Sequence, residues 1–215
     1  MKNFLSPDSK FGRVLYGMGK LIILSWLWLI CSIPIFTIGA ASSALYDITR
    51  RVISGTERKI ASDFFASFRS NFKQATPLWL IVLPICIILA YSLSLFLVLN
   101  DSSTIGKLIV LCAVLIVALF LCWITVVFSY LARFEDTFKT AAKNCFVMCI
   151  LNPLNCFWII AQGAAVVYFL TIIPFITWLP TILSLAPACY CALMVTPIER
   201  IFADYIPKDP PAEGE

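Results

Sequence analysis

The sequence contains no histidine, and only 13% of its 215 residues are charged. Histidine is the commonest general base and metal ligand in proteins, so its absence excludes Ser–His and Cys–His catalytic pairs. A soluble globular domain carries about 25% charged residues. Phosphate-binding glycine loops and carboxylate pairs at catalytic spacing are also missing. We therefore predict no catalytic residue, no cofactor and no enzymatic activity.

None of the nine cysteines forms a C-x-x-C pair. Cys145 with Cys149, and Cys189 with Cys191, are close in sequence, but neither pair has a complementary pair at the spacing of a zinc site. Metal or redox use of these pairs is the alternative to a simple packing role. Because most cysteines lie in apolar runs, we predict small packing residues and no metal site.

Apolar residues are abundant, since 61% of the chain is hydrophobic. Several runs approach the ~20 apolar residues that a helix needs to cross a bilayer. The sequence therefore predicts an all-α, polytopic transmembrane helical bundle in a lipid bilayer. We expect one domain over residues 1–206 and a polar, disordered tail over residues 207–215.

The distribution of positive charge favours a reversal of the chain near the N-terminus. A single crossing over residues 21–46 gives five spans and leaves five of the 16 basic residues outside. A helical hairpin that turns at Pro34, Thr37 and Gly39 leaves Lys107 alone outside. The positive-inside rule favours the hairpin, with both termini cytoplasmic and about six hydrophobic arms.

The first two arms cover residues 16–33 and 38–51, and the second either spans or is re-entrant. A cleaved signal peptide is the alternative for the first arm, but the small residues after it also suit close helix packing. Further spans are predicted at residues 76–99, 108–131, 157–173 and 181–198, with a kink at Pro84, a turn or helix start at Asn152-Pro153 and an interruption at Pro187.

A charged segment between the second and third arms has a helical aromatic period. Phe64, Phe68 and Phe72 recur every four residues, with Asn71 and Lys73 beside them. The first interpretation is an amphipathic helix at the membrane interface. The second is a docking surface for a partner, formed by these five residues.

Asp47, Arg50 and Arg51 are the charges nearest to a membrane-embedded position. They lie at the end of the second arm, so we expect their side chains to reach water. No predicted span has a charge at its middle, which argues against a carboxylate relay for coupled transport.

The N-terminal third resembles the YesL-like family of bacterial integral membrane proteins, a domain of unknown function. The matching pattern consists of Phe4, Pro7, Ser9, Pro34-x-x-Thr37-x-Gly39, Ala44-Leu45-Tyr46, Asp63-Phe64-Phe65 and Phe68-x-x-Asn71-Phe72-Lys73-Gln74-Ala75. This chain has Ser25-Trp26 where the family pattern has Asn-Leu, and Asp47 where a second aromatic often follows Ala-Leu-Tyr.

The resemblance implies a protein of the bacterial cytoplasmic membrane. Family members often lie beside genes for carbohydrate ABC transporters, which implies an accessory or regulatory role in sugar uptake and permease subunits as partners. The alternative is a self-contained small-solute permease, in which the breaks at residues 34–39 and 174–180 line a cavity.

Overall fold

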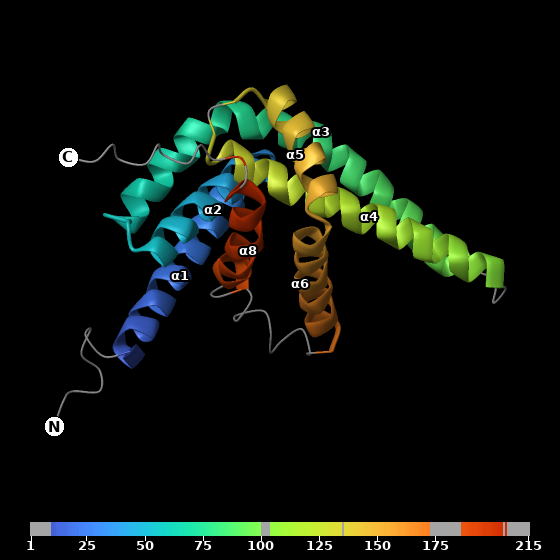
Figure 1. Ribbon diagram of the computed structural model, residues 1–215, viewed down its shortest axis with the longest axis horizontal. Helices are drawn as coiled ribbons and strands as arrows, with labels where there is room; N and C mark the ends of the chain where they lie inside the picture. Colours follow the sequence, from blue (N-terminus) through green and yellow to red (C-terminus); the bar gives the residue numbers. More distant parts are fainter. Residues whose placement is uncertain (1–9, 100–103, 135, 173–185, 204, 206–215) are drawn as a thin grey trace, which may run out of the picture.

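A computed structural model describes residues 10–99, 104–134, 136–172, 186–203 and 205 (Figure 1). Every regular element within these residues is helical, which confirms the all-α prediction. The elements are α1 (Lys10–Ser32), the 3₁₀ turn η1 (Ile35–Thr37), α2 (Ile38–Ser54), α3 (Ile60–Leu99), α4 (Thr104–Leu131), α5 (Phe138–Leu151), α6 (Pro153–Ile172) and α8 (Ala186–Ala203). The predicted tail at 207–215 and the proline-rich turn at 174–180 lie outside the described residues.

The predicted N-terminal hairpin is confirmed. The Thr37 hydroxyl donates to the carbonyl of Pro34 at 2.6 Å, which closes the turn between α1 and α2. The Trp79 indole N–H donates to the carbonyl of Ile35 at 2.7 Å and holds the turn against α3. An ion pair between Lys20 and Glu57 joins α1 to the loop after α2. The middle of α1 therefore lies beside the end of α2, and the two helices run in opposite directions.

Helix α2 is the central element of the fold. It packs against α1, α3, α4 and α8, and its residues from Gly39 to Thr49 are buried with one half-buried exception. Gly39 makes this packing possible, because a Cβ there would lie 2.7 Å from the Cβ of Trp79 and 2.8 Å from the carbonyl oxygen of Ala75. Small residues at such positions let helix backbones approach closely in membranes.

Helix α3 joins two segments that the sequence analysis treated separately. The charged segment and the span that follows it form one 40-residue helix, with Pro77 and Pro84 inside it. Its course changes direction over the top of the molecule in Figure 1. Prolines bend helices because they remove a backbone donor and crowd the preceding turn. The kink predicted at Pro84 in particular stays a prediction.

The aromatic stripe of α3 faces inward, which corrects both interpretations of Phe64 as an outward-facing residue. Phe64 is fully buried in a cluster with Leu24, Leu45 and Ile48. Phe68 packs against this cluster and against the larger core, and Phe72 packs against the larger core. The helical period was read correctly, but the stripe packs on α1 and α2 and leaves Phe64 unable to contact lipid or a partner.

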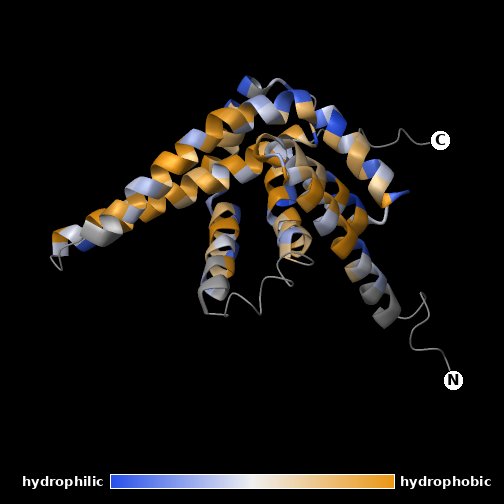
Figure 2. Cartoon of the chain, turned by 180° about the vertical axis from the view of Figure 1, so that it is seen from behind, coloured by the Kyte–Doolittle hydropathy of each residue, from blue (hydrophilic) through white to orange (hydrophobic). Residues whose placement is uncertain are grey.

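Helices α3 and α4 are long and apolar enough to cross a membrane by themselves. Figure 2 shows their long hairpin as a hydrophobic arm, whereas hydrophilic residues gather along the first part of α3. The predicted span at 108–131 corresponds to α4. Exposed Ile81, Ile88, Leu108 and Leu115 lie along the two helices, as expected for side chains that face lipid.

A sharp bend between two helices lies at Asn152-Pro153, where the sequence analysis predicted a turn or a helix start. Helix α5 was not predicted, and it meets α6 at Asn152-Pro153 with a bend of 98°. The two helices together could form a broken span or a re-entrant segment. Pro187 lies next to Ala186, the first described residue of α8. Residues 181–185 of the predicted last span lie outside the described residues, so the interruption at Pro187 stays a prediction.

Ser25 joins the hairpin to the last helix. Its side chain is fully buried, and its hydroxyl accepts a hydrogen bond from the backbone N–H of Ala188 at 3.2 Å. A position at which the chain departs from the family pattern thus contacts a helix 163 residues away.

Candidate functional site

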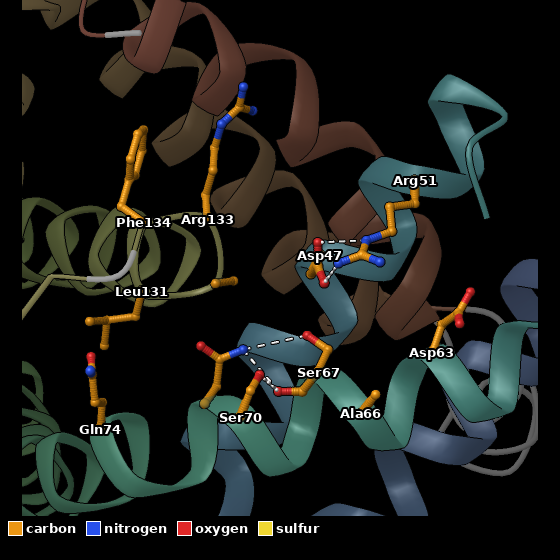
Figure 3. Close-up of a pocket in the computed structure, with 12 residues that line it drawn as sticks. Asp47, Arg51, Asp63, Ala66, Ser67, Ser70, Gln74, Leu131, Arg133 and Phe134 are labelled. Atoms are coloured by element: carbon orange, nitrogen blue, oxygen red, sulfur yellow. Dashed lines mark hydrogen bonds and ion pairs between the residues drawn. The ribbon is translucent and has the colours of Figure 1, made fainter. Parts of the chain in front are cut away.

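A polar pocket of about 690 Å³ lies between α2, the first part of α3 and the end of α4 (Figure 3). Its lining combines charged, hydroxyl and amide side chains with a few apolar ones. The lining residues are Asp47, Arg51, Asp63, Ala66, Ser67, Ser70, Asn71, Gln74, Leu131, Ala132, Arg133 and Phe134. We call this cavity the polar pocket.

The α3 wall of the polar pocket follows from helical spacing. Asp63, Ser67, Ser70 and Gln74 recur at intervals of four, three and four residues, so they lie along one face of the helix. The Phe64, Phe68 and Phe72 stripe lies on the adjacent face and enters the core. Burial of the aromatic stripe thereby turns the polar stripe toward the pocket.

Asp47 is the most deeply buried charge of the pocket, with 3% of its surface exposed. Its two carboxylate oxygens accept hydrogen bonds from Nε and Nη2 of Arg51 at 3.0 and 2.7 Å. Arg50 contributes a longer contact of 3.5 Å. The expectation that Asp47 reaches water is therefore wrong, because a bidentate arginine one helical turn away supplies the charge and the donors that water would otherwise provide.

The other pocket groups on α3 are held by local hydrogen bonds. Asp63 accepts from the backbone N–H groups of Arg58 and Lys59 at 3.0 and 3.1 Å, which ties the entry into α3 to its first turn. Asn71 Nδ2 and Ser70 Oγ both donate to the carbonyl of Ser67 at 2.9 Å. The side chain of Gln74 makes no hydrogen bond within the part of the chain that the structure describes. The wall therefore has fixed polar groups and one amide able to bind a ligand.

A second polar cluster borders the pocket and joins three helices. Glu199 of α8 accepts a hydrogen bond from the Tyr46 hydroxyl at 2.6 Å and pairs with Arg133, directly after α4. In Figure 3 the Arg133 side chain points away from Ser67 and Gln74. Tyr130 donates to Asp136 at 2.6 Å. Charged and hydroxyl groups of α2, α4 and α8 thus meet at the same end of the bundle.

Neighbouring protein groups already engage the hydroxyls and carboxylates that line the polar pocket. Its hydroxyls are those of Ser67 and Ser70; the first accepts from the Asn71 amide, and the second donates to a backbone carbonyl, so neither is paired with a base. Its carboxylates are engaged by Arg51 and by backbone N–H groups. Neutral amides and hydroxyls beside paired charges suit hydrogen bonding to a polar ligand or to a segment of a partner protein.

The predicted site residues separate into three places. Asn71 lines the polar pocket, while Lys73 is exposed on the same helix. Phe64, Phe68 and Phe72 belong to the core. Pro34 and Thr37 lie in the connection between α1 and α2, and Gly39 lies in the first turn of α2. All three line neither the polar pocket nor the apolar cavity between α4, α5 and α6.

The sequence analysis missed Ser67, Ser70, Gln74 and Arg133 as pocket residues. The first three could have been found from the sequence, because they follow the same helical period as the aromatic stripe on the adjacent face of the helix. Arg133 carried none, because 59 residues separate it from Gln74 and only the packing of α4 against α3 brings the two segments together.

The fold and its long apolar helices define a helical membrane protein. Residues 21–93 match the family described as a protein of unknown function, DUF624. The match covers about half of α1, all of α2 and most of α3, and so includes the turn between α1 and α2 and the α2 and α3 walls of the polar pocket. No curated protein and no solved structure showed significant similarity to the chain.

Proposed function

We propose that this protein is a non-enzymatic accessory or regulatory component of carbohydrate uptake, and that it binds a transporter subunit at the polar pocket. The observation that carries the proposal is the pocket itself, which offers hydrogen-bonding groups at the charged end of a membrane bundle and no nucleophile–base pair among its lining residues. A binding role uses these groups without requiring a reaction.

The carbohydrate part of the proposal comes from the resemblance to YesL-like proteins, with which the match to a family of unknown function is consistent. The same resemblance supports a bacterial cytoplasmic membrane as the location. We place both termini and the polar pocket on the cytoplasmic side, because Arg51, Lys73 and Arg133 lie near the pocket and basic residues favour that side.

The pocket replaces the aromatic stripe as the docking candidate. Phe68 is half-buried between two core clusters, so Phe68→Asp would disturb the fold as well as any contact. Ser70 is exposed on the pocket wall and accepts a large side chain at lower cost to the core. A large side chain at Ser70 therefore blocks the pocket, and its effect on partner binding can be measured without a change in folding.

We expect Ser70→Trp to abolish co-purification of carbohydrate ABC-permease subunits from membranes of the native host, because the indole fills the pocket. The matched control is Ser62→Trp, which adds the same side chain to an exposed position of α3 outside the pocket. Quantitative mass spectrometry of tagged, detergent-solubilised protein measures the recovery. Equal recovery of permease subunits with both variants, at equal membrane levels, contradicts docking at the pocket.

The permease alternative is favoured by the 98° break between α5 and α6, since transporters use broken helices at membrane depth. The cavity beside this break is lined by apolar side chains and cysteines, which does not suit a polar solute. Uptake of radiolabelled sugar by liposomes that contain only this protein would support the permease and overturn the accessory role.

A further inference from the structure

We propose that Cys122, Cys149 and Cys156 form a binding site for one monovalent copper ion. These residues come from α4, α5 and α6, and their three sulfur atoms lie within 4.8 Å of one another. Separations of 27 and seven residues conceal the cluster in the sequence. This copper site is separate from the polar pocket, whose lining includes none of the three cysteines.

The thiol cluster lies at the break between α5 and α6. Cys122 and Cys156 are buried and Cys149 is half-buried. The Cys156 thiol donates to the carbonyl of Cys149 at 3.5 Å, and the Cys122 thiol to the carbonyl of Cys156 at 3.9 Å. Thiols are weak donors, so the loss of these contacts on metal binding costs little.

The distances suit a shared metal. Metal–sulfur bonds of about 2.3 Å separate the sulfurs of one site by roughly 4 Å. Sulfur atoms that already lie within 4.8 Å reach this spacing through side-chain movements of less than about 1 Å each. Since the three residues occupy three helices, a bound ion would also join α4 to both sides of the α5–α6 break.

Monovalent copper fits the donor set better than zinc does. Soft thiolates select copper(I), zinc and iron–sulfur clusters, and structural zinc is almost always held by four ligands. An adjoining cavity of about 540 Å³ is lined by the three cysteines and otherwise by side chains that do not ligate metals: Leu119, Trp123, Phe146, Ile150, Pro153, Phe157 and Ile160. A fourth protein ligand is therefore missing from this lining, whereas copper(I) accepts two or three sulfurs.

Copper binding requires no redox step. Two S–H bonds break, three copper–sulfur bonds form, and two protons leave to solvent. Copper remains monovalent, and the third cysteine coordinates as a neutral thiol. The site then carries a single net negative charge, which limits the cost of burying it among apolar side chains.

The test uses the full-length, reduced protein in detergent under anaerobic conditions, titrated with copper(I) against bicinchoninate as a competing chelator. We expect one ion per chain and a thiolate-to-copper absorption band in the near ultraviolet. Cys156→Ser keeps the size of the side chain but removes a metal ligand. Mutating residues that only orient metal ligands lowers metal affinity about 10–100-fold. We therefore expect Cys156→Ser to lower the affinity for copper(I) by more than this. Cys112→Ser is the matched control, because Cys112 is exposed on α4.

A second measurement needs no variant and so does not depend on folding of the Cys156→Ser protein. Alkylation of the wild-type protein with and without copper(I), followed by mass spectrometry, should show protection at Cys122, Cys149 and Cys156. The proposal is overturned by the absence of bound copper, by protection at other cysteines, by equal affinity of Cys156→Ser, or by stoichiometric binding of zinc in place of copper.

Discussion

Gly39→Leu is expected to destabilise the protein by about 3 kcal/mol, the upper end of the cost of overpacking a close-packed interior. The added Cβ alone would lie 2.8 Å from the carbonyl oxygen of Ala75 and 2.9 Å from Cε1 of Phe128. A backbone oxygen cannot move away as the end of a flexible side chain can. Helix α2 must therefore shift away from α3 and α4, and with it the walls of the polar pocket. Reversible unfolding in mixed detergent micelles, followed by tryptophan fluorescence, measures the loss.

Gly19→Leu is the matched control for this prediction. Gly19 lies in α1, and a Cβ added there would have no atom within 4 Å, so the same side chain enters open space. We expect its free energy of unfolding to stay within about 0.5 kcal/mol of the wild-type value. Equal losses in both variants would show that α2 does not approach α3 as closely as the structure indicates.

Arg51→Ala is expected to cost about 1–3 kcal/mol, less than the 3–5 kcal/mol of a fully buried pair because 43% of the Arg51 side chain is exposed. The substitution leaves the buried carboxylate of Asp47 with only the 3.5 Å contact to Arg50. A carboxylate that has lost its donors pays for burial without compensation. Unfolding in mixed micelles again gives the free energy.

The double variant Asp47→Asn/Arg51→Ala tests this explanation. Asparagine removes the charge that Arg51 neutralises, so we expect the double variant to be more stable than Arg51→Ala alone. Arg69→Ala is the control, because Arg69 is exposed on the neighbouring helix, and its effect should stay within about 0.5 kcal/mol. A double variant less stable than the single one would show that Arg51 acts through packing of its stem, with no role for the charge.

Both predictions concern α2, the helix whose place in the fold links the hairpin to the polar pocket. Gly39 at its start sets the approach to α3 and α4, and Asp47 near its end lines the pocket. The family match covers all of α2. Disturbing either end should therefore change stability and partner binding together, whereas Ser70→Trp should change binding alone.

Most of the helices and the hairpin could be predicted from the sequence because they depend on local properties. The backbone N–H and C=O groups of an apolar run that crosses a bilayer must hydrogen-bond within the run, and a helix satisfies this requirement. Pro34 and Gly39 interrupt one such run, and the count of basic residues favours a reversal there. The helical period of Phe64, Phe68 and Phe72 was equally visible, since it repeats within one segment.

What covers each helix face was decided by the tertiary structure. Periodicity identifies an apolar face but does not say whether lipid, a partner or another helix covers it, and Phe64 is covered by residues of α1 and α2. The same limit applies to the charge of Asp47. Its position near a helix end indicated that its side chain would reach water. Helix α2 lies at the centre of the bundle, however, and Arg51 supplies the hydrogen bonds that water would have supplied.

The sequence by itself determined that this is a membrane protein built of helices with an N-terminal hairpin, because composition and local period depend on nearby residues alone. Only the tertiary structure placed Arg133 and Gln74 in the lining of one polar pocket and gathered the sulfur atoms of Cys122, Cys149 and Cys156 within 4.8 Å of one another. The reason is physical: both sites join residues on different helices, and the packing angles between helices depend on contacts distributed over the whole bundle.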